Sequence, residues 1–252
     1  MARWSSPRCS ILFSLALLIG PPGAVFAAST VSTIRDTNAP ATTGAGAAAV
    51  VGVCTLESGT RDVGVSQGFL GDEFTMLATH ISPASCTACP QPTSLLLNNV
   101  SFAVKWLEPM SWDVEVSVVG ATIGAGPQGP CLAPDFTSEI CRASTYTLHG
   151  VAGPQAAYTL ALPASCCIAG DAFVVLRFRN RVPADANTPA LGSAFPPCRD
   201  CEQYFTTATG FPIPTDWCPQ AGNPLWVAVG ADCCAPTPTR EPSWGTLKVH
   251  YR

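Results

Sequence analysis

In the segment Asp113-Val114-Glu115-Val116-Ser117-Val118, valine alternates with polar residues. Because successive side chains of a β-strand point to opposite faces, this period of two predicts a strand with one apolar and one polar face. A second stretch, Phe173-Val174-Val175-Leu176-Arg177-Phe178-Arg179, begins as a continuous apolar run and ends in alternation. It is typical of a central strand whose end reaches solvent.

Strand-like segments of the same kind recur along most of the chain. Only 12% of the residues are charged, whereas 24 Pro and 21 Gly interrupt the sequence, and this composition favours short strands and turns over long amphipathic helices. The spacing predicts an all-β fold, a single β-sandwich or jelly-roll-like domain over residues 49–234 that is stapled by disulfides. The expected strands are residues 49–55, 73–81, 100–107, 112–119, 145–150, 157–162, 172–179 and 224–230.

The N-terminus has the residue order of a cleavable secretion signal. Arg3 and Arg8 precede an apolar run over residues 11–19, and small residues follow up to Ala27. The apolar run is too short for a membrane span, which takes about 20 residues. We therefore expect a signal peptide over residues 1–27, a protein secreted to the extracellular space or the cell envelope, and no membrane span after cleavage.

Two terminal segments flank the predicted sandwich. Residues 28–48 are rich in Ala, Thr and Gly, and most of them are expected to form a flexible or loosely docked N-terminal arm. Residues 235–252 begin as a Pro-rich spacer. Their last part alternates like an edge strand but also fits one face of a short helix behind Ser243, so both possibilities stay open.

Cysteine use agrees with export. The sequence has 13 cysteines, of which Cys9 lies in the signal peptide, and the even number that remains predicts a framework of up to six disulfides whose pairing the sequence does not set. Adjacent cysteines should bond to separate partners, because a ring between neighbours distorts the peptide between them. The cysteines of the framework are Cys54, Cys86, Cys89, Cys131, Cys141, Cys166, Cys167, Cys198, Cys201, Cys218, Cys233 and Cys234.

Two Cys-x-x-Cys units, residues 86–89 and 198–201, have the spacing found within zinc-ribbon pairs. The long interval between them and the oxidising compartment favour structural disulfides instead. A thioredoxin-like role would need a βαβ pattern, and the sequence has none. We therefore expect neither a metal nor another cofactor.

The charge balance limits the partners. The chain has 13 Lys and Arg against 17 Asp and Glu, a net charge of −4, and its basic residues do not cluster. An acidic chain without a basic patch lacks the electrostatic footprint of a nucleic-acid binder. We expect an extracellular glycan or protein partner and no nucleic acid.

One motif suggests a serine nucleophile. Gly64-Val65-Ser66-Gln67-Gly68 matches the Gly-x-Ser-x-Gly elbow of serine hydrolases, which works because a strand feeds a sharp turn that opens a helix. The flanking residues are expected to supply neither the strand nor the helix. The histidines His80, His149 and His250 are isolated in the sequence, so none is an expected catalytic base.

Carboxylates suggest a second kind of hydrolase. A glycosidase needs two carboxyl groups at a separation that its fold sets. Asp200 and Glu202 are one such pair, whereas Asp113 and Glu115 alternate with valine and are expected on a solvated face. We assign no catalytic residue, and the alternative hypothesis is a secreted hydrolase of a glycan or ester that uses Ser66 or a carboxylate pair.

Aromatic residues support the leading hypothesis, a secreted non-catalytic binding or structural module. Sugar rings stack on exposed aromatic faces. Trp106 and Trp226 lie inside apolar segments and are expected in the core. Trp217 and Tyr204 lie in a region rich in Pro and Cys, where exposure is easier, and are the speculative ligand-binding residues, although packing against a disulfide is an alternative role for each.

Three stretches together resemble uncharacterised Cys-rich exported proteins of environmental bacteria. The resemblance covers roughly the C-terminal third of the chain. It implies export and disulfides, and it implies no activity. The stretches are Cys166-Cys167-Ile168-Ala169-Gly170-Asp171-Ala172-Phe173-Val174-Val175, then Pro197-Cys198-Arg199-Asp200-Cys201-Glu202-Gln203-Tyr204-Phe205, then Ala231-Asp232-Cys233-Cys234 with Ser243-Trp244-Gly245-Thr246-Leu247-Lys248.

Overall fold

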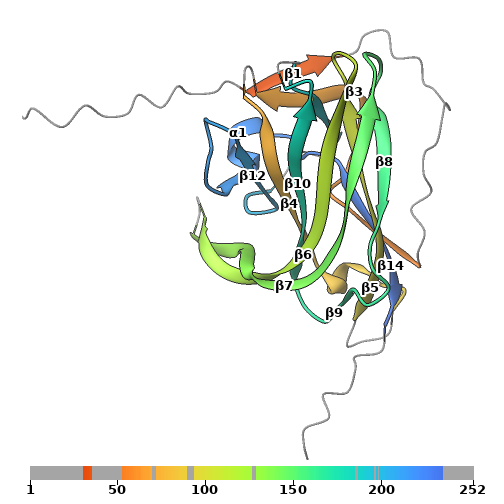
Figure 1. The fold of residues 1–252 in the computed structure, drawn as a ribbon. Coiled ribbons are helices and arrows are strands. Elements are labelled where there is room, and N and C mark those ends of the chain that lie inside the picture. The colour runs from red at the N-terminus through yellow and green to blue at the C-terminus, as the bar shows by residue number, and fades with distance from the viewer. Residues whose placement is uncertain are drawn as a thin grey trace, which may run out of the picture.

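The computed structural model describes residues 31–35, 53–69, 72–89, 94–126, 129–184, 187–195, 197 and 199–234. In these residues two antiparallel sheets pack face to face (Figure 1). The predicted all-β, disulfide-stapled sandwich is confirmed. The expected signal peptide, most of the N-terminal arm and the C-terminal tail lie outside the described residues.

The first sheet is built around a central strand that is paired along both edges. Residues 100–104 of this strand are all buried, as expected for a strand with neighbours on both sides. The spatial order is β1-β3-β11-β5-β14-β2. In addition, β8 and β9 pair with β5 along the edge opposite β14. The strands are β1 (Val31–Arg35), β2 (Cys54–Glu57), β3 (Thr60–Phe69), β5 (Leu95–Lys105), β8 (Ala156–Ala161), β9 (Cys167–Ile168), β11 (Ala190–Phe195) and β14 (Val227–Cys233).

The second sheet contains both segments, 113–118 and 173–179, whose patterns predict strands. They form neighbouring strands, in which Val116 lies opposite Leu176, and the strand with residues 173–179 is central as predicted. Val114, Val116 and Val118 point into the sandwich and are fully buried. The spatial order is β13 (Thr215–Asp216), β12 (Gln203–Thr207), β4 (Phe74–Ile81), β10 (Ala172–Val182), β6 (Met110–Gly126) and β7 (Gly129–Gly150).

Helix is scarce in the described residues. It consists of a 3-10 turn, η1 (Pro83–Ser85), and one turn of α-helix, α1 (Cys218–Ala221). None of the described helices has the length and apolar character that crossing a membrane requires. The strands therefore supply nearly all of the regular hydrogen bonding in this part of the chain.

Aromatic rings fill the space between the sheets. Trp112 of β6 stacks on Phe178 of β10 with ring centroids 4.2 Å apart. A second group joins Phe69 of β3 to Phe205 of β12, which stack at 5.1 Å, and so connects the two sheets. Burying one such side chain stabilises the fold by about 1.5–3 kcal/mol, which makes this core the main source of stability.

A smaller hydrophobic cluster covers the outer face of the second sheet. The far end of the β6–β7 hairpin curls back (Figure 1), and Leu132 and Ala133 of this end pack against Phe173 and Val175. Outward-pointing apolar residues of β10 are thereby covered although they face away from the main core. The curl is held by the disulfide Cys131–Cys201, which joins β7 to the turn before β12.

Five disulfides lie within the described residues, and Cys218 is disulfide-bonded as well. Each member of the two adjacent cysteine pairs bonds to a separate partner, as predicted. Two bridges connect the sheets: Cys54–Cys86 joins β2 to the turn after β4, and Cys141–Cys166 joins β7 to the segment before β9. The five bridges are Cys54–Cys86, Cys89–Cys233, Cys131–Cys201, Cys141–Cys166 and Cys167–Cys234.

Two segments of the N-terminal half form strands that the sequence pattern does not predict. Val31–Arg35, within the arm predicted to be for the most part flexible or loosely docked, forms β1 and pairs with β3. Thr60–Phe69, expected to supply no strand, is a ten-residue strand that pairs with β1 on one side and β11 on the other. The sequence pattern did not predict this strand, because the segment contains several glycines and Gly has a low strand propensity.

Candidate functional site

The aromatic residues expected to bind a ligand are buried, which corrects the prediction of exposure. Trp217 is 0% exposed, its indole N–H donates to Asn223 O at 2.8 Å, and its ring packs edge-on against Phe205 at 5.1 Å. It belongs to the core between the sheets and offers no face to a sugar. Trp226, expected in the core, is instead half-buried and lies beneath the guanidinium of Arg61.

Tyr204 is 7% exposed and takes the alternative role of packing against a disulfide. Its hydroxyl donates to Leu132 O at 3.0 Å and lies 3.4 Å from Cys131 Sγ. Burial raises the pKa of Tyr204, and the negative charge of Asp216 acts in the same direction. The phenol is therefore a neutral, structural group that anchors the curled end of the hairpin.

Ser66 lies inside β3, and the strand runs through the motif with an irregular register toward β11 but without a turn or a helix. The serine is 1% exposed, and its hydroxyl accepts a hydrogen bond from Gln155 Nε2 at 3.1 Å. Among the described residues, no histidine hydrogen-bonds to it. The Gly-x-Ser-x-Gly match is therefore a buried strand segment. In the described residues Ser66 has neither the sharp turn into a helix nor the neighbouring histidine base that a nucleophilic serine requires.

The Asp200 and Glu202 pair lies in one turn rather than across a cleft. The Glu202 carboxylate accepts a hydrogen bond from Arg199 N at 3.0 Å. Asp216 lies behind this turn, and burial raises the pKa of its carboxyl group. Hydrogen bonds from backbone N–H groups lower this pKa, whereas the negative charges of Asp200 and Glu202 raise it further. One of these bonds, from Cys201 N at 2.7 Å, holds Cys201 at a φ of 66°.

The expectation of a solvated face for Asp113 and Glu115 is wrong for Glu115. Glu115 is 9% exposed, and its carboxylate lies 3.4 Å from Arg142, 3.5 Å from Arg179 and 3.8 Å from Arg177. Asp113 accepts hydrogen bonds from Thr147 and Asn180 at the surface. These charges form a structural network on the outer face of the second sheet.

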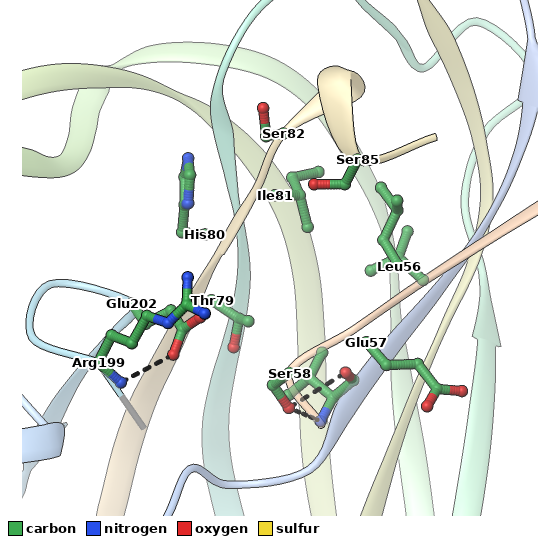
Figure 2. A pocket seen from close by; sticks show the side chains of 12 residues that line it. Leu56, Glu57, Ser58, Thr79, His80, Ile81, Ser82, Ser85, Arg199 and Glu202 are labelled. Carbon is green, nitrogen blue, oxygen red and sulfur yellow. Dashed lines mark hydrogen bonds between the residues drawn. The ribbon is translucent and has the colours of Figure 1, made fainter. Parts of the chain in front are cut away.

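A pocket of about 260 Å³ lies between β2 and β4, where the open edges of the two sheets approach each other (Figure 2). It combines an apolar wall with hydroxyl groups and with charged groups of both signs. Its lining residues come from four segments that are far apart in the sequence. They are Leu56, Glu57, Ser58, Thr79, His80, Ile81, Ser82, Ser85, Arg199, Glu202, Val227 and Val229.

Strand lengths explain why a pocket forms here. β12 pairs with β4 only as far as Thr79, so the end of β4 has no strand neighbour on that side. The turn of residues 199–202 takes the place of a strand, and Glu202 O accepts a hydrogen bond from His80 N at 2.9 Å. On the other side β2 is the last strand of its sheet. Two unfilled sheet edges thus face the same space.

Several polar groups of the pocket are held in place. Ser58 Oγ donates to Leu225 O at 2.8 Å and accepts from Val227 N at 2.9 Å. His80 Nε2 lies 3.2 Å from a carboxylate oxygen of Asp171, which fixes the orientation of the imidazole. Such fixed groups recognise a ligand without first losing conformational entropy.

The pocket does not present a pair of facing carboxylates. Figure 2 shows the carboxylate of Glu57 directed away from Glu202, while Arg199 and Glu202 lie below His80. Within the described residues, His80 hydrogen-bonds to Glu202 O and to Asp171 and to no hydroxyl of the pocket. The arrangement therefore offers hydrogen-bond donors, acceptors and charges, and it lacks an activated nucleophile.

Sequence reasoning named Glu202 as the partner of Asp200 and His80 as an isolated histidine, and it did not bring these two residues together. It missed Glu57, Arg199 and Ser82. The one available signal was the polar Thr-His-Ile-Ser end of an otherwise apolar strand at residues 79–82. That signal does not reveal which distant segments lie beside the strand end.

The zinc-ribbon interpretation of the Cys-x-x-Cys units is not supported by their positions. Cys86 and Cys89 bond to Cys54 and Cys233, whereas Cys201 bonds to Cys131 at the curled hairpin. The two units therefore serve different parts of the fold.

In comparisons with protein-family models, curated proteins and solved structures, no match to this chain is found.

Proposed function

We propose that this chain acts outside the cell as a non-catalytic binding module and that the pocket between β2 and β4 holds its ligand. The observation that carries the proposal is the mixed lining of the pocket, which combines Arg199 and Glu202 with hydroxyl groups and an apolar wall. Sugar residues and polar side chains present complementary hydroxyl, amide and carboxylate groups. The ligand class is therefore an extracellular glycan or a polar segment of a protein partner.

The size of the pocket limits what enters it. Sites for whole small molecules typically measure about 300–1,000 Å³, and this pocket of about 260 Å³ is smaller. It is suited to one residue of a longer ligand, such as the terminal sugar of a glycan. The remainder of the ligand would extend over the neighbouring surface.

The disulfides support both the binding role and the location. The Cys54–Cys86 bridge joins one wall of the pocket to the other, because it connects β2 to the turn that follows β4. A pocket that is preformed in this way binds at a lower entropic cost. A framework of five described disulfides is typical of proteins that work in an oxidising, extracellular compartment.

The alternative, a secreted hydrolase, has less support. Its serine candidate, Ser66, is buried in a strand and bonded to Gln155. Its carboxylate candidates, Asp200 and Glu202, share one turn, whereas glycosidase carboxyl groups flank the scissile bond. Hydrolysis of ester or glycoside substrates that disappears in Ser66→Ala or Glu202→Gln would restore this alternative and refute the binding proposal.

A glycan array of the labelled, disulfide-intact protein tests the proposal. We expect retention on a restricted set of glycans, and at least tenfold weaker retention for Arg199→Ala and Glu202→Gln. Arg179→Ala is the matched control, because this arginine lies on the outer face of the second sheet beside Glu115. Equal loss in the control would contradict a role for the pocket, and an empty array would eliminate the glycan version of the proposal.

A further inference from the structure

Four sulfur atoms of two disulfides gather at one end of the sandwich. Cys54 is bonded to Cys86 and Cys89 is bonded to Cys233, and the Sγ atoms of Cys86 and Cys89 are only 3.3 Å apart. The sulfur atoms of Cys54, Cys86 and Cys89 all lie within 4.8 Å of one another, the only such group of three cysteines in the described residues. Cys86 is therefore within reach of two alternative partners.

The cluster has one accessible member. Cys54, Cys86 and Cys89 are 8%, 2% and 5% exposed, whereas Cys233 is exposed at the end of β14. The two residues between Cys86 and Cys89 are exposed as well and form a turn. An external thiol can consequently approach the Cys89–Cys233 bond, while the Cys54–Cys86 bond is covered.

We propose that these four cysteines form a thiol–disulfide exchange site whose reaction partner is an external dithiol. A thiolate of the dithiol attacks Cys233 Sγ, the Cys89–Cys233 bond breaks, and Cys89 leaves as a thiolate. The Cys89 thiolate then attacks Cys86 Sγ, forming Cys86–Cys89 and releasing Cys54 as a thiolate. Exchange of this kind proceeds by attack of a thiolate on a disulfide sulfur through a mixed disulfide.

The second thiol of the partner completes the exchange. It attacks the mixed disulfide at Cys233, so the partner leaves as a disulfide and Cys233 becomes a thiol. The two protons of the dithiol end on Cys54 and Cys233. One dithiol is thus oxidised, and the bridges Cys54–Cys86 and Cys89–Cys233 are replaced by one Cys86–Cys89 bridge and two thiols.

The exchange would release a structural connection without unfolding the sandwich. After it, β2 is no longer bonded to the turn that follows β4, but it keeps its antiparallel pairing with β14. The exchange site also adjoins the pocket, since Leu56 and Ser85 line the pocket and lie within two residues of Cys54 and Cys86. The inference concerns the sulfur chemistry alone and does not depend on what the pocket binds.

Partial reduction of the native protein tests the inference directly. The oxidised protein is treated with a limiting amount of dithiothreitol, trapped with N-ethylmaleimide and mapped by mass spectrometry. In molecules that have gained two thiols we expect label on Cys54 and Cys233 and a Cys86–Cys89 cross-link. Label on Cys89 and Cys233, with Cys54–Cys86 intact, would overturn the inference, as would one zinc per chain with these cysteines unreactive.

A single substitution provides a second test that needs no reductant. In Cys233→Ser, Cys89 loses its partner and can attack Cys86, so we expect the label on Cys54 in most molecules rather than on Cys89. The matched control is Cys234→Ser, which leaves Cys167 without its partner outside the sulfur cluster, so the label should stay on Cys167. Label on Cys89 in Cys233→Ser would contradict the proposed exchange. Label scattered over many cysteines in both variants would contradict it as well.

Discussion

Replacing Asp72 by asparagine tests the buried carboxylate that holds the turn after β12. Asp72 is 3% exposed. One carboxylate oxygen accepts hydrogen bonds from Glu73 N at 2.9 Å and Thr209 N at 3.0 Å, and the other accepts from Gly210 N at 2.7 Å and from the Thr207 hydroxyl. Asparagine keeps one of these oxygens and replaces the other with an amide group that cannot accept.

The expected loss follows from the bonds that asparagine cannot replace. The Thr207 hydroxyl can rotate and accept from the new amide, whereas the N–H of Gly210 would face another donor. A buried donor left without a partner costs about 1–3 kcal/mol, and a hydrogen bond to a charged acceptor contributes about 1.5–3 kcal/mol. We therefore expect Asp72→Asn to lower the free energy of unfolding by about 2–3 kcal/mol at neutral pH.

The effect should depend on pH in a defined direction. Burial by itself raises the pKa of Asp72, but the hydrogen bonds from Thr207, Gly210, Thr209 and Glu73 outweigh it and lower the pKa below its ordinary value. A carboxyl group with a lowered pKa in the folded state stabilises the fold above its unfolded pKa, which is about 3.9. This contribution is lost as the pH falls through the folded pKa, so the difference from Asp72→Asn should shrink below about pH 4.

Urea unfolding of the disulfide-intact proteins, followed by tryptophan fluorescence at pH 7 and pH 3, measures both effects. Asp135→Asn is the matched control, because Asp135 also accepts hydrogen bonds, from Thr137, but is only half-buried on β7 and should change the stability much less. A difference at pH 7 that is no larger for Asp72→Asn than for the control would refute the reasoning. So would a difference that is equally large at both pH values.

Three further results are expected. Trp217→Ala should lower the free energy of unfolding by about 3–5 kcal/mol, because the indole is fully buried, and a loss below about 1 kcal/mol in denaturant titration would place the ring outside the core. Ser66→Ala should leave any hydrolysis of generic esters unchanged, since the hydroxyl is buried and bonded to Gln155, and an ester assay with a clear decrease would contradict this. Replacing Cys141 and Cys166 together by serine should cost about 3.5 kcal/mol by the loop-entropy relation for a separation of 25 residues. Urea titration measures this loss, and an unchanged midpoint would show that this bridge does not constrain the unfolded chain.

The fold could be predicted from the sequence where the side-chain period is local. The alternation at residues 113–118 and the apolar run at 173–179 predicted β6 and β10. A strand buried on one face alternates apolar and polar residues, and a strand buried on both faces is a continuous apolar run. β3 was missed because its glycines weaken that trace, although pairing on both sides stabilises the strand. Tertiary pairing therefore outweighed local propensity in β3.

The candidate site could be predicted only in fragments. Glu57, His80 and Arg199 are brought together by the order of strands in two sheets, and no residue spacing encodes that order. Trp217 and Tyr204 illustrate the opposite error. Their Pro- and Cys-rich surroundings suggested exposure, but Tyr204 is covered by the curled end of the hairpin and Trp217 packs against Phe205 in the core.

The disulfide pattern has a consequence for the fate of a cleaved chain. A peptide bond cut anywhere between Cys54 and Cys86, or between Cys89 and Cys234, leaves two pieces that a described bridge still joins. Between Cys86 and Cys89 no described bridge crosses the cut, and the residues there are exposed. A protease that opens this one turn would produce an N-terminal piece, with β2 and β4, that no described bridge joins to the rest of the chain.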